Sequence, residues 1–155
     1  MKFKDKAILF MATGGYVGKL PVAPGTAGSL IGILACWILS RIQLSLAAPA
    51  AAIFIFLAIA IAAAAEKLLN ESDPGCIVID EIAGMMITLL GLPFNWLIVA
   101  IGFVFFRILD ILKPFPIRRL ERRFSGGLGV VIDDLVAGFM ANLALRVVLM
   151  VKDRV

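Results

Sequence analysis

The stretch Val130–Met140 reads VVIDDLVAGFM, and it opens an apolar run that continues to Val151. This run predicts a long buried helix with two adjacent carboxylates, Asp133 and Asp134, near its start. A carboxylate that is buried without a partner is costly in free energy, so both acids need partners elsewhere in the chain. The stretch therefore predicts an all-α protein in which this helix packs against a second polar element.

A near copy of this pattern occurs earlier in the chain. The stretch Val78–Met86 reads VIDEIAGMM, and its acids Asp80 and Glu81 again open an apolar helix. A glycine follows in each copy, at Gly84 and Gly138, and leaves room for the backbone of a neighbouring helix. Carboxylates on two helix starts, in a chain without histidine, favour a site for Mg²⁺.

The composition is typical of a membrane protein. Hydrophobic residues make up 62% of the 155 residues and charged residues 17%, and the mean hydropathy is +1.05. The length predicts one domain over residues 1–155. The net charge of +4 is small, so we expect no nucleic-acid partner. The absence of histidine excludes Ser-His and Cys-His catalysis, and Cys36 and Cys76 lack the spacing of a metal site.

We expect a compact membrane-embedded bundle of about five main apolar helices plus a short N-terminal helix. The apolar helices are predicted at residues 28–46, 49–65, 77–92, 96–112 and 130–151. A signal peptide is the alternative interpretation of the basic and apolar start. The expected connections are a Gly/Pro-rich loop over 14–29, a tight link at Ala47–Pro49, a polar loop over 66–75 and a basic loop over 118–129.

The distribution of Lys and Arg predicts the orientation of these helices. If five spans alternate from a cytoplasmic N-terminus, the cytoplasmic side receives Lys2, Lys4, Lys6, Lys19, Lys67, Lys113, Arg118, Arg119, Arg122 and Arg123. The outer side receives only Arg41, Arg146, Lys152 and Arg154. This excess favours the proposed orientation. The four acids of the two helix starts then lie at one depth on the cytoplasmic face, which indicates a functional site.

Two further segments bring polar groups to that face. The Gly/Thr/Ser segment with Thr26 and Ser29 runs into a helix start, where it either contacts a phosphate or simply caps the helix. Arg107, Asp110 and Lys113 follow at spacings of three and share a helix face, as a structural ion pair or as part of the site. Asp133 and Asp134 have a structural alternative too, as capping acids beside Arg119 or Arg122.

These groups together suit metal-assisted hydrolysis of a phosphorylated lipid headgroup, with the acyl chains along the apolar helices. A small membrane transporter, or a non-catalytic membrane protein that uses the acids to bind ions, is the alternative. A CDP-alcohol phosphotransferase also uses aspartates and Mg²⁺, but its Asp-Gly-x2-Ala-Arg signature is absent.

Four blocks of the chain, in this order and spacing, resemble the phosphatidylglycerophosphatase A family. They are PGTAGS at 24–29, DEIAGM at 80–85, FRILDILKPFPI at 106–117 and GGLGVVIDDLVAG at 126–138. The resemblance implies a Mg²⁺-dependent, multi-pass enzyme of the bacterial cytoplasmic membrane, with its active site on the cytoplasmic face. Such an enzyme removes the terminal phosphate of phosphatidylglycerophosphate to give phosphatidylglycerol.

The resemblance and the chemistry together assign expected roles to individual residues. We expect the catalytic acids to be Asp80, Glu81, Asp133 and Asp134. The same four acids and Asp110 are the expected metal ligands. The expected substrate-binding residues are Thr26, Ser29, Arg107 and Lys113. Oligomeric state and selectivity among phosphomonoester headgroups stay open at this point.

Overall fold

The structure, a computed structural model, describes residues 2–121 and 123–152, with the side chains of Glu121 and Lys152 left aside. Arg122 and Arg154, which entered the predicted charge distribution, lie outside these residues. The described chain is all-α, as predicted, and contains no strand. Its elements are α1 (Phe3–Ala12), the 3₁₀ turn η1 (Val17–Lys19), α2 (Pro24–Leu39), α3 (Leu44–Leu69), α4 (Ile79–Leu89), α5 (Trp96–Leu112), α6 (Ile117–Glu121) and α7 (Gly127–Lys152).

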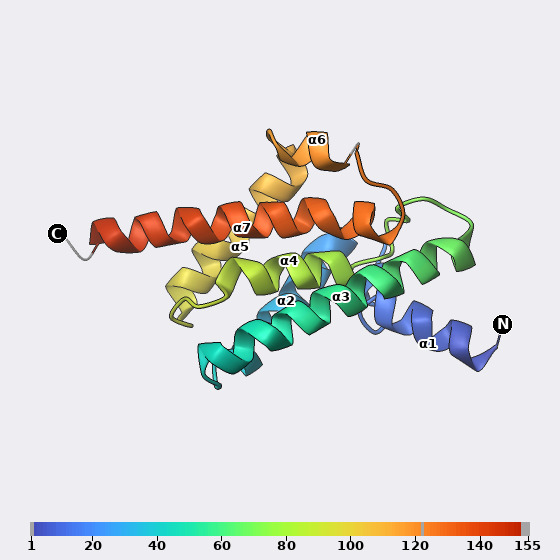
Figure 1. Ribbon diagram of the computed structural model, residues 1–155, viewed down its shortest axis with the longest axis horizontal. Helices are drawn as coiled ribbons and strands as arrows, with labels where there is room; N and C mark the ends of the chain where they lie inside the picture. Colours follow the sequence, from blue (N-terminus) through green and yellow to red (C-terminus); the bar gives the residue numbers. More distant parts are fainter. Residues whose placement is uncertain (1, 122, 153–155) are drawn as a thin grey trace.

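The short helix α4 is the centre of the bundle. It packs against α7, α2, α3 and α5, and Figure 1 shows it between α7 and α3. Nine of its 11 residues are buried, including Asp80. The approach of α7 depends on glycine: a Cβ at Gly138 would collide with the carbonyl oxygen of Gly84. Close backbone packing of this kind fixes the register between the two helices that carry the acids.

The predicted helix over 77–92 is too long, because α4 covers only Ile79–Leu89. At its start, the backbone N–H of Val78 donates to the carbonyl oxygen of Ala12, which holds the incoming chain on α1. At its end, Gly91 adopts a positive φ of 70° and turns the chain away. A helix of this length spans about 16 Å, roughly half of a bilayer's hydrocarbon core.

Other predicted boundaries also need correction. Pro49 lies inside α3 and is not a link, because a 26-residue apolar helix tolerates the loss of one hydrogen bond. The connection between α2 and α3 lies at residues 40–43 instead, and α3 continues to Leu69, into the predicted polar loop. Helix α2 begins at Pro24, whose fixed φ suits a first helical position. The predicted basic loop contains α6.

Two predicted elements are confirmed. A short N-terminal helix is present as α1, and α5 covers residues 96–112, as predicted. The start of α5 is capped by Asn95, whose side-chain oxygen accepts from the backbone N–H of Ile98 at 3.0 Å. Its end is set by Lys113, which has a φ of 45° and precedes Pro114.

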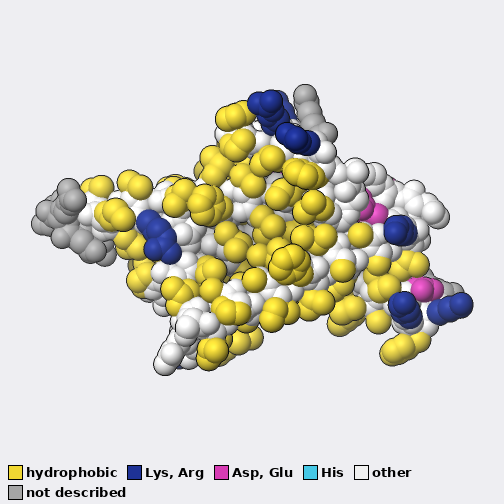
Figure 2. Space-filling model, viewed as in Figure 1, with side chains coloured by type: hydrophobic (Ala, Val, Ile, Leu, Met, Phe, Trp, Pro, Cys, Tyr) yellow, Lys and Arg dark blue, Asp and Glu magenta, His cyan; other side chains and the backbone are white. Residues whose placement is uncertain are grey.

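Much of the apolar surface lies outside the core. Helices α3 and α7 are each long and apolar enough to cross a membrane, and only 22% and 33% of their most apolar windows are buried. Figure 2 shows hydrophobic side chains across the middle of one face, with most of the visible Lys and Arg near its edges. Phe56, Trp96 and Phe139 are 57–81% exposed. A surface of this kind suits contact with hydrocarbon better than contact with water.

Candidate active site

The starts of α4 and α7 bring the predicted acids together. Carboxylate oxygens of Asp80, Glu81 and Asp134 lie within 4.8 Å of one another. Carboxylate oxygens of Asp110, Asp133 and Asp134 form a second group, in which they again lie within 4.8 Å of one another. All five predicted metal ligands therefore meet where α4, α5 and α7 converge, and Asp134 belongs to both groups.

These carboxylates are buried and only partly satisfied. Asp80 and Asp133 are 7% exposed and Asp134 is 3% exposed. Glu81 Oε2, Asp133 Oδ1 and Asp134 Oδ1 are buried and have no hydrogen-bond partner among the described residues. Buried acids at this separation repel one another, and each oxygen without a partner adds a desolvation cost. A divalent cation would relieve both costs, and a donor set made only of carboxylate oxygens fits Mg²⁺.

Arg107 lies on one side of the acids and is held from three directions. Its Nη1 lies 2.6 Å from Asp110 Oδ2, 3.9 Å from Glu81 Oε1 and 3.5 Å from Ser29 Oγ. The Ser29 hydroxyl is fully buried and donates to the carbonyl oxygen of Gly25 at 2.9 Å. In this structure Ser29 therefore orients Arg107, and its expected contact with substrate stays a prediction.

Lys113 lies on the other side, at the end of α5. Its Nζ lies 2.6 Å from Asp133 Oδ2, and its side chain is 24% exposed. A cavity of about 420 Å³ opens beside it, and Arg118 and Arg119 from α6 also line that cavity. The pairing shows that Asp133 faces a basic group while Asp134 faces the other acids. An open recess with three basic side chains thus lies beside Lys113, which in turn contacts Asp133 of the acid cluster.

The first turn of α2 lies against the acid cluster and forms one wall of the site. The residue that caps this helix is Ala23, not Thr26 or Ser29, so the capping alternative for those two residues is wrong. A Cβ at Gly25 would collide with Glu81 Oε1 and would lie 3.2 Å from Arg107 Nη1. Thr26 is half-buried in the same turn. The N–H groups of a first helical turn have no partner within the helix and attract anions.

Two residues that shape the site were not predicted from the sequence. Gly25 allows α2 to approach Glu81, and its place inside PGTAGS was its signal. Asn142 is buried in the middle of α7 and donates to three carbonyl oxygens at the end of α4. A single asparagine within a long apolar run was its signal.

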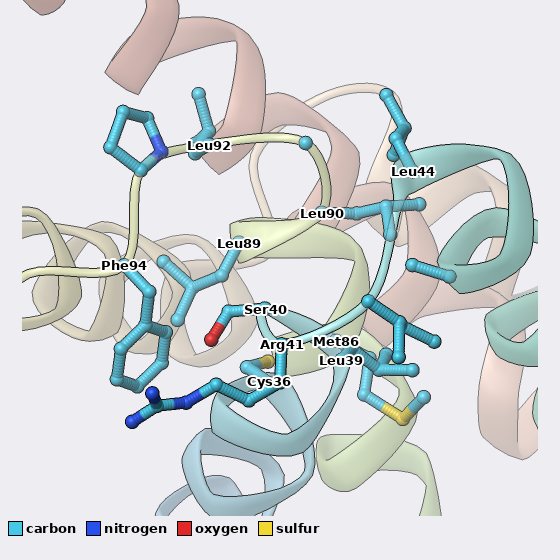
Figure 3. Close-up of a pocket in the computed structure, with 14 residues that line it drawn as sticks. Cys36, Leu39, Ser40, Arg41, Leu44, Met86, Leu89, Leu90, Leu92 and Phe94 are labelled. Carbon is cyan, nitrogen blue, oxygen red and sulfur yellow. The ribbon is translucent and has the colours of Figure 1, made fainter.

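A separate cavity of about 420 Å³ lies at the opposite end of α4 (Figure 3). Most of the residues that line it are apolar, Leu89, Leu92 and Phe94 among them, and Arg41 and Ser40 lie at one side. No acid lines this cavity. The chemistry that the acids can support therefore belongs to the other end of α4.

Buried acids beside two cationic side chains and a helix N-terminus are typical of enzymes that act on phosphate groups. Comparison with known proteins agrees with this class. The model of the family Phosphatidylglycerophosphatase A matches residues 10–149, and the chain belongs to that family of phosphatases.

Three relatives are similar over most of the chain. Phosphatidylglycerophosphatase A of Escherichia coli is 41% identical over 84% of this chain and 77% of its own. The enzyme of the same name from Haemophilus influenzae is 35% identical over 86% of this chain and 83% of its own. A Bacteroides thetaiotaomicron protein named "Putative phosphatidylinositol-3-phosphatase" is 37% identical over 90% of this chain and 91% of its own. No solved structure matches the chain significantly.

Proposed function

We propose that the protein hydrolyses the terminal phosphate of phosphatidylglycerophosphate and releases phosphatidylglycerol and inorganic phosphate, with Mg²⁺ as its cofactor. Two relatives that cover most of the chain carry the corresponding name. The observation that carries the proposal is the convergence of three buried and two partly buried carboxylates with Arg107 and Lys113 beside an open recess. This arrangement supplies metal ligands, a base and phosphate-binding groups in one place.

Asp80, Glu81, Asp134, Asp133 and Asp110 would hold the metal. When bound, Mg²⁺ would offset the negative charge of the phosphate and of the transition state. The buried oxygens without partners, on Glu81, Asp133 and Asp134, support this assignment because a cation satisfies them.

The remaining steps fall to side chains at the edge of the acid cluster. Asp133 or Glu81 accepts a proton from the attacking water, whichever of the two keeps a carboxylate oxygen that the metal does not hold. The water oxygen bonds to phosphorus, and the bond from phosphorus to the glycerol oxygen breaks. The proton taken up by the carboxylate then passes to that glycerol oxygen, which leaves as the hydroxyl group of phosphatidylglycerol. Lys113 and Arg107 bind the phosphoryl oxygens, and Thr26 with the first turn of α2 completes the phosphate site.

The proposed location is the bacterial cytoplasmic membrane, with several helices in the bilayer and the site at its cytoplasmic face. The exposed apolar surfaces of α3 and α7 support this placement. The 11-residue α4 ends partway through the bundle, so its N-terminal acids can lie near the membrane surface. A lipid substrate would then keep its acyl chains in the bilayer while its headgroup enters the recess beside Lys113.

A second candidate substrate is a phosphoinositide. The Bacteroides relative, 37% identical to this chain, is named for a phosphatidylinositol-3-phosphatase activity. The same acids and cations could serve either phosphomonoester, because they contact the phosphate and not the alcohol. Selectivity would then depend on the recess lined by Arg118 and Arg119.

The test is phosphate release by the purified, detergent-solubilised protein, with Mg²⁺ and with a chelator. The substrates are phosphatidylglycerophosphate, phosphatidylinositol 3-phosphate, phosphatidate and a soluble phosphomonoester. We expect Mg²⁺-dependent release, fastest from phosphatidylglycerophosphate and lost in Asp80→Ala and Asp134→Ala. A folded sample that releases phosphate from none of them would instead favour ion transport or a non-catalytic role.

A further inference from the structure

We propose that the acid cluster binds two divalent cations and that Asp134 is a ligand of both. The inference rests on the proposed phosphatase function and concerns the composition of its metal site. Its first support is geometric. The five acids form two groups, each within 4.8 Å, and only Asp134 belongs to both. Carboxylate oxygens this close together can be ligands of one Mg²⁺, so each group could supply ligands to its own ion.

The two groups also come from different pairs of helices. Asp80 and Glu81 of α4 complete the first group with Asp134 of α7. Asp110 of α5 and Asp133 of α7 complete the second. The two sets are therefore positioned by the separate packing of α4 and of α5 against α7. Two neighbouring ions would match this division, whereas one ion would leave part of the set unused.

Unpartnered oxygens occur in both groups. Asp134 is 97% buried, since its exposed fraction is 3%, and its Oδ1 has no hydrogen-bond partner. In the first group, Glu81 Oε2 is likewise buried and has no hydrogen-bond partner among the described residues. In the second group, the same holds for Asp133 Oδ1. The ion pairs of Arg107 and Lys113 use other oxygens of these acids: Asp110 Oδ2, Glu81 Oε1 and Asp133 Oδ2. Each group thus retains a buried acceptor that a cation would satisfy.

The balance of charge favours a second ion once substrate binds. Five carboxylates face two cationic side chains, Arg107 and Lys113, which leaves three negative charges. A phosphate monoester adds about two more near neutral pH. One divalent cation would leave about three negative charges around a phosphate that must be bound, and two would leave about one. Two-metal sites use such a pair to stabilise both the attacking and the leaving oxygen.

The experiment counts Mn²⁺, a substitute for Mg²⁺ that can be observed by electron paramagnetic resonance. Full-length protein in detergent is equilibrated with excess free Mn²⁺, and bound metal is measured per chain. We expect two Mn²⁺ per chain and a spectrum with exchange coupling, because ions that share a carboxylate lie about 3.5–4 Å apart. Glu81→Gln and Asp110→Asn should each retain one ion and lose the coupling.

The matched control is Glu71→Gln, which removes an exposed acid outside the cluster and should keep both ions. Asp133→Asn is a second probe of the Asp110 group if Asp110→Asn does not fold by circular dichroism. Saturation of the wild type at one ion or none, or an uncoupled spectrum, would overturn the proposal. Phosphate release is measured on the same samples. A protein that releases phosphate with one bound ion would overturn the two-ion proposal but leave the proposed function intact. A protein that binds two ions and releases no phosphate would contradict the proposed function alone.

Discussion

The side-chain amide nitrogen of Asn142 lies 3.0 Å from the carbonyl oxygen of Leu90, so α7 caps the C-terminal end of α4. The same nitrogen donates to the carbonyl oxygens of Ile87 and Thr88, and Arg146 Nε donates to Asn142 Oδ1 at 2.8 Å. A helix that ends inside a bundle leaves its last carbonyl groups without partners, and Asn142 supplies the missing donor. This contact sets the position of α4 along α7, and so the position of Asp80 beside Asp134.

Replacement of Asn142 by leucine should destabilise the protein. The change removes the side-chain donor to the carbonyl oxygens of Ile87, Thr88 and Leu90, of which only Leu90 keeps a second side-chain donor, Arg146, among the described residues. We expect a cost of about 1–3 kcal/mol. The measurement is the free energy of unfolding in detergent. Leu143→Ala, which alters the exposed neighbour on α7, is the control and should change it by much less. Equal effects of the two variants would contradict the capping role.

Alanine at position 138 should separate α4 from α7. A Cβ there would collide with the carbonyl oxygen of Gly84, so the helices must move apart, at a cost of about 1–3 kcal/mol. The shift would also separate Asp80 from Asp134, so phosphate release should fall at least about tenfold. Gly75→Ala is the control, because nothing lies within 4 Å of a Cβ at that position. A Gly138→Ala variant with normal stability and turnover would show that this contact is not required.

Asp134→Asn should leave the protein folded and nearly inactive. The amide has almost the same shape as the carboxylate but cannot supply the negative charge that a cation needs at this buried position. We expect turnover to fall by about 100-fold or more, the range found for groups that take part directly in catalysis. Circular dichroism checks the fold, and Glu71→Gln is the charge-matched control. Wild-type turnover in Asp134→Asn would remove this residue from the mechanism.

Loss of the charge at position 113 should weaken substrate binding more than it slows turnover. Lys113 is paired with Asp133 and lines the open recess, so it can also contact an incoming phosphate. A hydrogen bond to a charged group contributes about 1.5–3 kcal/mol, so Lys113→Gln should raise KM by roughly 10-fold or more. Lys113→Arg should recover part of the loss. Lys67→Gln, at the end of α3, should leave KM unchanged and serves as the control.

Mg²⁺ should stabilise the folded protein, and a chelator should reverse the effect. Binding at 100 times the dissociation constant adds about 2.7 kcal/mol to the free energy of unfolding. For a chain of this size the melting temperature should rise by about 5–10 °C. Differential scanning fluorimetry measures the shift, with NaCl of equal ionic strength as the control. The rise should be smaller in Asp134→Asn, and an equal rise in both proteins would place the bound ion elsewhere.

Local patterns in the sequence were sufficient for part of the structure. The adjacent acids at the starts of two apolar helices predicted the cluster around Asp80 and Asp134, and the structure brings these residues together. The bounds of α5 were also predicted, because Asn95 and Pro114 mark its two ends by local chemistry. The prediction was wrong for Pro49, because a long apolar helix accommodates it. It was wrong for the length of α4, because contacts with distant residues set the ends of that helix.

The sequence by itself determined the chemistry of the site: oxygen ligands, two nearby cations, no histidine, and helices apolar enough for a membrane. These properties follow from residue types and from spacing along single helices. Only the tertiary structure decided that Asp134 joins two groups of acids, that Ser29 holds Arg107 and that Asn142 ends α4. The physical reason is register: helical periodicity defines which residues share a face, but the contact between Gly84 and Gly138 decides which faces meet and at what height.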